Sequence, residues 1–182
     1  AGQTRGMPSR RSAGILLFRR VAAEPGPHEP AVQVLIGHMG GPLWARKDDA
    51  AWSIPKGEHG EDEEPFAAAR REFHEEMGSP APDVAYLDLG TVRQSGGKTV
   101  AVWAGEADFD ADAARSVTFE MPWPPRSGRV QSFPEIDRAQ WLGLDAAAPK
   151  LIVGQRVFLD RLRTALGLTS EPSPAPPPMA AG

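Results

Sequence analysis

The segment RREFHEEMG, residues 70–78, gathers three glutamates near the end of a helical pattern. Glu72, Glu75 and Glu76 fall at positions i, i+3 and i+4, which share one face of an α-helix. Like charges at this spacing repel, and the carboxyl end of a helix already carries partial negative charge. A bound divalent cation would resolve this conflict, because it turns the repulsion into a shared attraction.

The residue types available restrict which cation this is. Carboxylate oxygens are the hard ligands that Mg²⁺ or Mn²⁺ prefers. The sequence has no cysteine and only scattered histidines, at positions 28, 38, 59 and 74. A dedicated zinc site is therefore not expected, and we predict Mg²⁺ or Mn²⁺ as the cofactor.

Local signals define the helix that carries the glutamates. Pro65 suits a first helical turn and Gly78 is a typical stop signal. An apolar stripe recurs at helical spacing and is expected to face the core: Phe66, Ala69, Phe73 and Met77. The glutamates lie to one side of this stripe, so we expect a helix over residues 65–77 with a buried face and an acidic face.

The remaining pattern predicts a mixed sheet with a few helices. A short helix is expected from Asp145 to about Pro149, and an amphipathic helix over residues 154–167. Strands are expected at 13–19, 32–38, 52–54, 84–93, 99–107, 116–121 and 138–142. These elements indicate an α+β fold, an α/β/α sandwich.

The chain is predicted to contain one domain, over residues 11–168. Residues 1–10 are expected to form a flexible N-terminal segment, in which residues 1–6 precede Met7 and are interpreted as an addition to the native sequence. Residues 169–182, rich in proline and alanine, have no core-forming content and are expected to be disordered.

Composition excludes several partners. The net charge is −4 and no block of Lys and Arg stands out, so duplex nucleic acid is not expected as a partner. No apolar run approaches the roughly 20 residues of a membrane span, and the first residues lack a signal-peptide pattern. We therefore expect a cytoplasmic protein, a monomer or a homodimer, that acts on a small molecule.

Residues 57–79, GEHGEDEEPFAAARREFHEEMGS, resemble the Nudix box, the sequence motif of the Nudix hydrolase family. The matching positions are Gly57, Glu63, Arg71, Glu72, Phe73, Glu75, Glu76 and Gly78. Ser79 stands where the motif has an apolar residue, which affects packing after the helix. With the flanking strands and the closing helix, the resemblance covers about residues 11–167. It implies a Nudix fold, a mixed sheet flanked by helices.

The resemblance also implies a reaction and roles for the box residues. Nudix hydrolases cleave a nucleoside diphosphate linked to another group X, and the metal lowers the pKa of an attacking water. By resemblance, Glu72 and Glu76 are metal ligands, Glu75 is a ligand or the base, and Glu72 is a rival candidate for the base. The carbonyl of Gly57 is a further ligand, and Arg71 and Glu63 orient the carboxylates.

A further carboxylate is expected from outside the box. Glu135 stands six residues before Trp141, the spacing that the loop glutamate of this family often shows. We predict that Glu135 is a metal ligand, with Glu120 as the alternative.

Basic residues outside the box predict long phosphate chains as substrates. Lys56, in PKG, is typical of Nudix enzymes for dinucleoside polyphosphates and diphosphoinositol polyphosphates. KTVAVW (98–103) and WLGL (141–144) are similar to segments of asymmetrical diadenosine tetraphosphate hydrolases, in which the lysine matching Lys98 contacts phosphate. Arg46 and Lys47 are further candidates for phosphate binding.

One departure concerns the nucleobase. Ala139 replaces the tyrosine that stacks on adenine in those hydrolases. Candidates to replace its ring are Trp44, Phe133 and Trp123.

The favoured reaction is cleavage of diadenosine tetraphosphate to ATP and AMP. Alternatives within the enzyme class are a (d)NTP pyrophosphatase and a hydrolase of diphosphoinositol polyphosphates or nucleoside-diphosphate sugars. The alternative from another class is a non-catalytic Nudix module that senses nucleotides.

Overall fold

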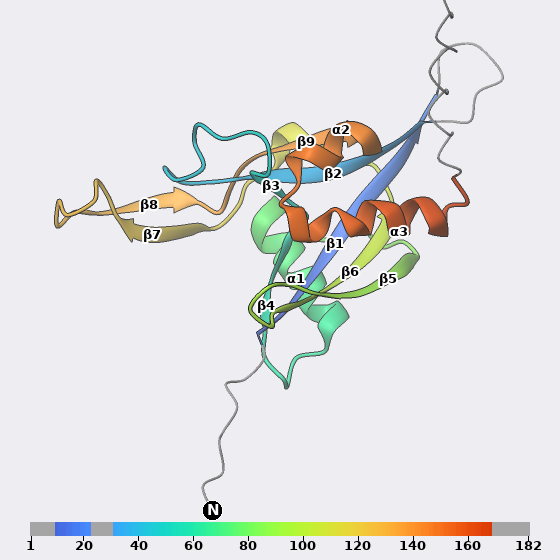
Figure 1. Cartoon of the computed structure of the whole chain (residues 1–182), viewed down its shortest axis with the longest axis horizontal. Helices are drawn as coiled ribbons and strands as arrows, with labels where there is room; N and C mark the ends of the chain where they lie inside the picture. The colour runs from blue at the N-terminus through green and yellow to red at the C-terminus, as the bar shows by residue number, and fades with distance from the viewer. Residues whose placement is uncertain (1–9, 23–30, 169–182) are drawn as a thin grey trace, which may run out of the picture.

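The computed structural model describes residues 10–22 and 31–168. Its centre is a seven-stranded mixed sheet with helices on both faces (Figure 1). Residues 1–9 and 169–182, predicted to be a flexible segment and a disordered tail, lie outside the described residues.

The sheet follows the order β3-β2-β1-β6-β5, with β4 added to β1 and β9 added to β2. Strands β1 and β6 are parallel, and the other neighbours are antiparallel. The strands are β1 (Arg11–Val21), β2 (Ala31–Met39), β3 (Trp52–Ser53), β4 (Lys56–His59), β5 (Tyr86–Arg93), β6 (Thr99–Glu106) and β9 (Ile136–Gly143). Every predicted strand of this sheet is present, and β4 is an additional strand after the predicted one at 52–54.

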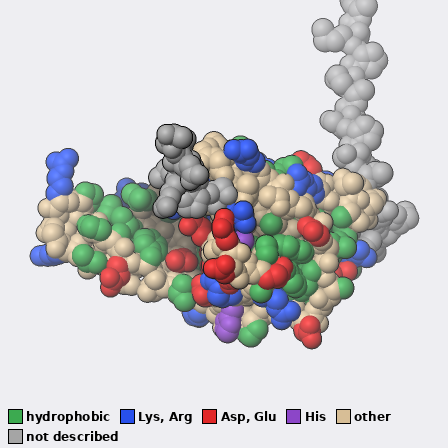
Figure 2. Space-filling view, turned by 90° about the horizontal axis from the view of Figure 1, so that it is seen from below, with side chains coloured by type: hydrophobic (Ala, Val, Ile, Leu, Met, Phe, Trp, Pro, Cys, Tyr) green, Lys and Arg blue, Asp and Glu red, His purple; other side chains and the backbone are tan. Residues whose placement is uncertain are grey.

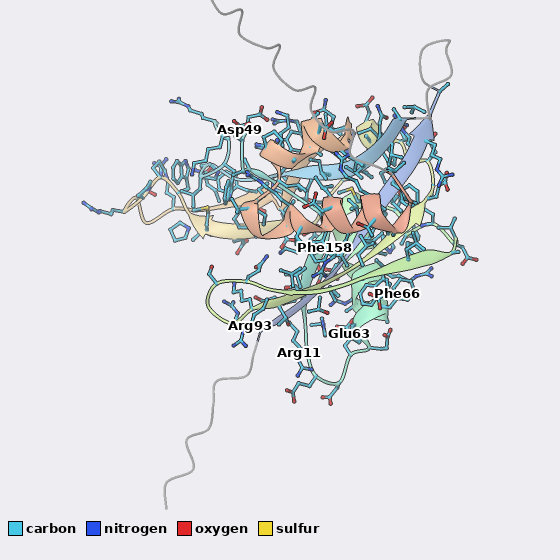
Figure 3. All side chains as sticks on the ribbon, turned by 45° about the vertical axis from the view of Figure 1, so that its right-hand side comes forward. Arg11, Asp49, Glu63, Phe66, Arg93 and Phe158 are labelled. Carbon is cyan, nitrogen blue, oxygen red and sulfur yellow. The ribbon has the colours of Figure 1, made fainter. Side chains whose placement is uncertain are left out.

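Two apolar clusters fix the layers. On one face, α1 (Pro65–Met77) packs on β1 through Ala69 and Phe73, against Ile15. On the other face lie α2 (Leu144–Lys150) and α3 (Val157–Ala165), which packs through Phe158. Figure 3 shows Phe66 of α1 and Phe158 of α3 on opposite sides of the sheet. This arrangement confirms the predicted α/β/α sandwich.

Helix α1 begins and ends as its local sequence predicts. Glu64 caps its start, accepting from the backbone N–H groups of Phe66 and Ala67 at 3.1 and 2.8 Å. Gly78 ends it with φ of 77°, and its N–H donates to the carbonyl of His74. A left-handed residue at this position costs little only for glycine, so the stop signal is a conformational requirement.

The acidic side of α1 is more buried than its position beside the apolar stripe predicts. Glu72 and Glu76 are only 7% and 8% exposed, whereas Glu75 is half-buried. The cause is β4 and the turn before it, which pack against this side of the helix. Glu72 and Glu76 are therefore largely enclosed by protein, whereas Glu75 remains partly exposed to solvent.

A two-stranded hairpin projects from the body (Figure 1). It consists of β7 (Thr118–Pro122) and β8 (Val130–Pro134), paired antiparallel so that Phe119 faces Phe133. Strand β8 was not predicted, because its sequence VQSFP is short, half polar and ends in proline. Pairing with β7 stabilises it as a strand.

Candidate active site

The turn before β4 brings the backbone to the glutamates of α1. The N–H of Lys56 donates to Oε2 of Glu76 at 3.0 Å. A Cβ atom on Gly57 would lie 2.0 Å from the carboxyl carbon of Glu72, so a larger residue would displace that carboxyl group. Gly57 therefore allows the Glu72 carboxylate to lie directly against the box loop.

Arg71 links three carboxylates. Its Nε and Nη2 donate to the two oxygens of Glu63 at 2.8 and 3.0 Å, and Nη1 donates to Glu72 at 2.7 Å and to Glu75 at 3.2 Å. The bond to Glu63 raises the pKa of Arg71 above its usual range and lowers the pKa of Glu63. Arg71 therefore connects Glu63 with Glu72 and Glu75, and the orienting role that the resemblance implies for Arg71 and Glu63 stays a prediction.

Burial makes the carboxylates harder to ionise. Desolvation raises the pKa of Glu76 to about 8, although the Lys56 N–H opposes this shift. Desolvation also raises the pKa of Glu72 in spite of Arg71, and the pKa of Glu135, to which the charge of Glu75 contributes. A nearby positive charge would relieve this penalty.

Glu135 lies beside the box although it is about sixty residues from it in sequence. The N–H of Gly40 donates to its carbonyl at 2.8 Å, and its own N–H donates to the carbonyl of Val117 at 3.0 Å. Its charge acts on Glu72 and Glu76. We call Glu72, Glu75, Glu76 and Glu135 the acidic cluster. Glu120, the alternative ligand, is exposed on β7.

The acidic cluster suits a hard cation by its chemistry, because carboxylate oxygens are the donors that Mg²⁺ and Mn²⁺ prefer. Within the described ranges, no group of three histidine, aspartate or glutamate side chains converges on one point. Arg71 donates to Glu72 and Glu75, and the N–H of Lys56 donates to Glu76. Three of the four carboxylates of the cluster are thus hydrogen-bonded within the protein.

A pocket of about 260 Å³ opens beside the cluster. We call it the Trp44 pocket; its lining includes Trp44, Ser53, Lys56, Glu76, Phe119 and Glu135. It combines two aromatic rings, one lysine and two carboxylates. These are the groups that a nucleoside polyphosphate and a cation need together.

The predicted phosphate-binding residues fall into two groups. Lys56 lines the Trp44 pocket, and Arg46 and Lys47 are exposed on the adjoining loop, with Nζ of Lys47 5.0 Å from the Trp44 ring. Lys98 lies elsewhere, in the turn between β5 and β6, where its carbonyl accepts from Gln94 at 2.7 Å. The structure does not bring Lys98 into the lining of this pocket.

The three aromatic residues predicted as candidates to stack on the nucleobase lie in different parts of the structure. Trp44 lines the pocket, whereas Phe133 packs on Phe119 with ring centroids 6.1 Å apart, and Trp123 lies at the far end of the hairpin. Phe119 was not predicted. Only pairing between β7 and β8 and the glycine at position 41 place its ring in the pocket wall.

Gln155 is a second residue that the sequence did not indicate. It is fully buried and lies about one hundred residues from its partners. Its Oε1 accepts from the N–H of Ile54 at 2.7 Å, and its Nε2 donates to Ser53 at 3.0 Å. Gln155 therefore fixes the turn that delivers Lys56 and Gly57. Its partners are too distant in sequence for a local pattern to reveal.

Comparison with known proteins now decides the family. Residues 8–162 match the family model described as NUDIX domain. The chain belongs to the Nudix family. This match confirms the predicted fold and supports the predicted enzyme class, a Nudix pyrophosphohydrolase. Nudix hydrolases generally use divalent metals such as Mg²⁺ or Mn²⁺.

Individual relatives add detail. An 8-oxo-(d)GTP phosphatase of Mycolicibacterium smegmatis is 32% identical over 146 residues, which cover 78% of this chain and 37% of that protein. The chain thus matches little more than a third of that relative's length.

Solved Nudix structures resemble the fold. A C. elegans Ap4A hydrolase in a binary complex has a TM-score of 0.58 at 18% identity, covering 86% of this chain and 98% of that one. A mutT/nudix family protein from Listeria innocua has a TM-score of 0.57 at 14% identity, covering 89% and 96%. Identities this low show the fold alone, so the predicted diadenosine tetraphosphate branch is not confirmed. Among the described residues, no helix has the length and apolar character to cross a membrane.

Proposed function

We propose that this Nudix protein hydrolyses a phosphoanhydride bond of a nucleoside polyphosphate with the help of Mg²⁺ or Mn²⁺. The observation that carries the proposal is the pair of buried carboxylates, Glu72 and Glu76, of which Glu76 lines the Trp44 pocket together with Lys56. A buried pair of acids with raised pKa values is costly for the fold alone and suits a cation-binding role.

The cation would be held by carboxylate oxygens of the acidic cluster and by the carbonyl of Gly57. When bound, it neutralises phosphate charge and lowers the pKa of the attacking water. Arg71 keeps Glu72 and Glu75 oriented through the bonds described above. Glu75 is half-buried and keeps access to solvent, which suits the acceptance of a proton from water.

Lys56 and Trp44 bind the substrate in this proposal. The ammonium of Lys56 lies in the pocket lining with Glu76 and provides a point charge for a phosphate. The indole of Trp44 provides a face on which a nucleobase stacks, a contact worth about 1–3 kcal/mol per base. Arg46 and Lys47, exposed on the same loop, add positive charge at the mouth of the pocket.

The first substrate candidate is a nucleoside triphosphate with an oxidised purine. The sequence relative named as an 8-oxo-(d)GTP phosphatase supports it. The pocket, about 260 Å³, is at the small end for nucleotide-sized ligands, since such pockets usually measure roughly 300–1,000 Å³. It therefore suits one nucleoside better than two.

The hairpin favours a second candidate, a dinucleoside polyphosphate. Phe119 and Met121 alternate along β7 and share a face with Phe133, and Trp123 follows directly after the strand. This face continues from the Trp44 pocket along the projecting hairpin. Figure 2 shows hydrophobic side chains along the hairpin and acidic ones where it meets the body. A second nucleobase could stack there while its phosphates reach Lys56.

A substrate panel tests both candidates. The purified chain is incubated in Mg²⁺ and in Mn²⁺ with 8-oxo-dGTP, dGTP, diadenosine tetraphosphate, ADP-ribose and a diphosphoinositol polyphosphate, and products are separated by chromatography. We expect hydrolysis of 8-oxo-dGTP above dGTP. ATP and AMP released from diadenosine tetraphosphate at a higher kcat/KM would instead favour the second candidate.

Two variants separate catalysis from binding. Glu76→Gln is expected to reduce kcat by about 10²–10⁴-fold, whereas Glu120→Gln, on exposed β7, is expected to retain wild-type turnover. Nucleotide binding without turnover of any substrate in either metal would refute the enzymatic proposal and favour a sensing module.

A further inference from the structure

His38, near the end of β2, is fully buried and has a hydrogen-bond partner at each ring nitrogen. Its Nδ1 lies 2.9 and 3.0 Å from the two carboxylate oxygens of Asp137, and its Nε2 lies 2.7 Å from the carbonyl oxygen of Lys47. The ring therefore bridges the carboxylate of Asp137 on β9 and a backbone carbonyl of the loop that carries Trp44.

A β-bulge directs Asp137 toward this ring. In the pairing of β2 with β9, Met39 faces Ile136 and His38 faces Arg138, so Asp137 is the extra residue. Bulges of this kind re-aim side chains, often beside functional sites. Asp137 also lies two residues after Glu135, a member of the acidic cluster.

The second partner of His38, the carbonyl of Lys47, connects the ring to the opposite wall of the Trp44 pocket. His38 bonds the carbonyl of Lys47, the N–H of Lys47 donates to the carbonyl of Trp44 at 2.9 Å, and the N–H of Trp44 donates to Gly41 at 3.2 Å. A continuous series of hydrogen bonds thus runs from the buried ring to the pocket tryptophan.

We propose that His38 is a positioning residue that, through its hydrogen bonds, holds the two walls of the Trp44 pocket in register. One wall is the loop with Trp44 and the other is the segment with Glu135 that leads into β9. The predicted effect on substrate affinity rests on the proposed function, whereas the effect on loop order does not.

Trp52 packs on the same ring. Its ring centroid lies 5.2 Å from that of His38 in a T-shaped arrangement, and its indole N–H donates to Asp48 at 2.9 Å. Asp48 follows Lys47 directly, so Trp52 adds a second side-chain contact between the sheet and this loop.

The experiment measures positioning. In His38→Leu we expect amide exchange at Trp44 and Lys47 to accelerate at least about tenfold, with α1 amides unchanged. KM for 8-oxo-dGTP should rise at least about tenfold, with kcat within about twofold of wild type. His38→Gln keeps an amide donor for the Lys47 carbonyl and should retain the wild-type exchange rates and KM. His74→Leu, on the exposed side of α1, is the matched control and should behave as wild type.

Unchanged exchange and KM in folded His38→Leu would refute the positioning role, as would equal effects in the His74 control. If His38→Leu fails to fold, His38→Gln replaces it, because its amide keeps a donor for Lys47 and should keep the loop ordered. A wild-type chain without turnover would refute the proposed function, and the exchange rates would still decide the role of His38.

Discussion

Glu76 gives the most quantitative prediction, because burial raises its pKa to about 8 while the ordinary value is 4.5. Below pH 4.5 the side chain is protonated in both the folded and the unfolded chain. Between the two values the unfolded chain is ionised and the folded chain still holds its proton. The free energy of unfolding of the metal-free protein must therefore fall as pH rises through this window, and level off above about pH 8.

The size of the effect follows from the gap between the two pKa values. Each pH unit between them corresponds to about 1.4 kcal/mol, so the full gap corresponds to about 5 kcal/mol. Glu76→Gln removes the ionisable proton and keeps an oxygen that can accept from the Lys56 N–H. The variant should become more stable than wild type as pH rises, by several kcal/mol at pH 8.

The measurement is urea unfolding of both proteins in EDTA at intervals from pH 5 to 9. The difference in free energy of unfolding between variant and wild type should grow with pH. Excess Mg²⁺ should stabilise the wild type at pH 8 and have less effect on Glu76→Gln, because the cation binds the ionised folded form. Glu120→Gln serves as a control for removal of one carboxylate. A difference between Glu76→Gln and wild type that does not change with pH would refute the reasoning.

Three further predictions concern the geometry of the site. Arg71→Lys should lower kcat about 10–100-fold without unfolding, measured by turnover and circular dichroism, because lysine cannot bond several carboxylates in one plane. Gly57→Ala should weaken Mg²⁺ binding and turnover at least about tenfold, since its Cβ would overlap a box carboxyl group. Gly60→Ala is the control, because its Cβ would have nothing within 4 Å among the described residues, and it should change neither Mg²⁺ binding nor turnover. If Gly60→Ala lowered both as much as Gly57→Ala does, the packing argument would be contradicted. Gln155→Leu should lower the free energy of unfolding by about 1–3 kcal/mol in urea titrations, because the N–H of Ile54 loses its acceptor; unchanged stability would refute this.

Local sequence signals were sufficient to predict helix α1 and the positions of its glutamates. Pro65, Gly78 and the apolar spacing between them specify α1 within a single stretch of chain, because capping and helical periodicity act over a few residues. Glu135 could be anticipated only through the family resemblance, since its distance from the box is a property of the fold. Its place in the acidic cluster is now a structural observation, and its role as a ligand remains a prediction.

Other features depended on contacts that no local pattern encodes. The sequence placed Lys98 with the phosphates, but the sheet carries it into the β5–β6 turn, away from the Trp44 pocket. Phe119 and strand β8 were missed, because a hairpin strand with weak alternation is stabilised by its partner. His38 and Gln155 looked like isolated polar residues, and each has partners roughly one hundred positions away.

The amino-acid sequence alone thus determined which carboxylates share one face of helix α1 and where this helix begins and ends. Both depend on residues that lie within one or two helical turns of each other. Only the tertiary structure decided how deeply Glu72 and Glu76 are buried and which aromatic and basic side chains line one pocket with Glu76. Burial and proximity result from packing strands and loops that are distant in the chain, and desolvation by that packing is what raises the pKa values of both acids.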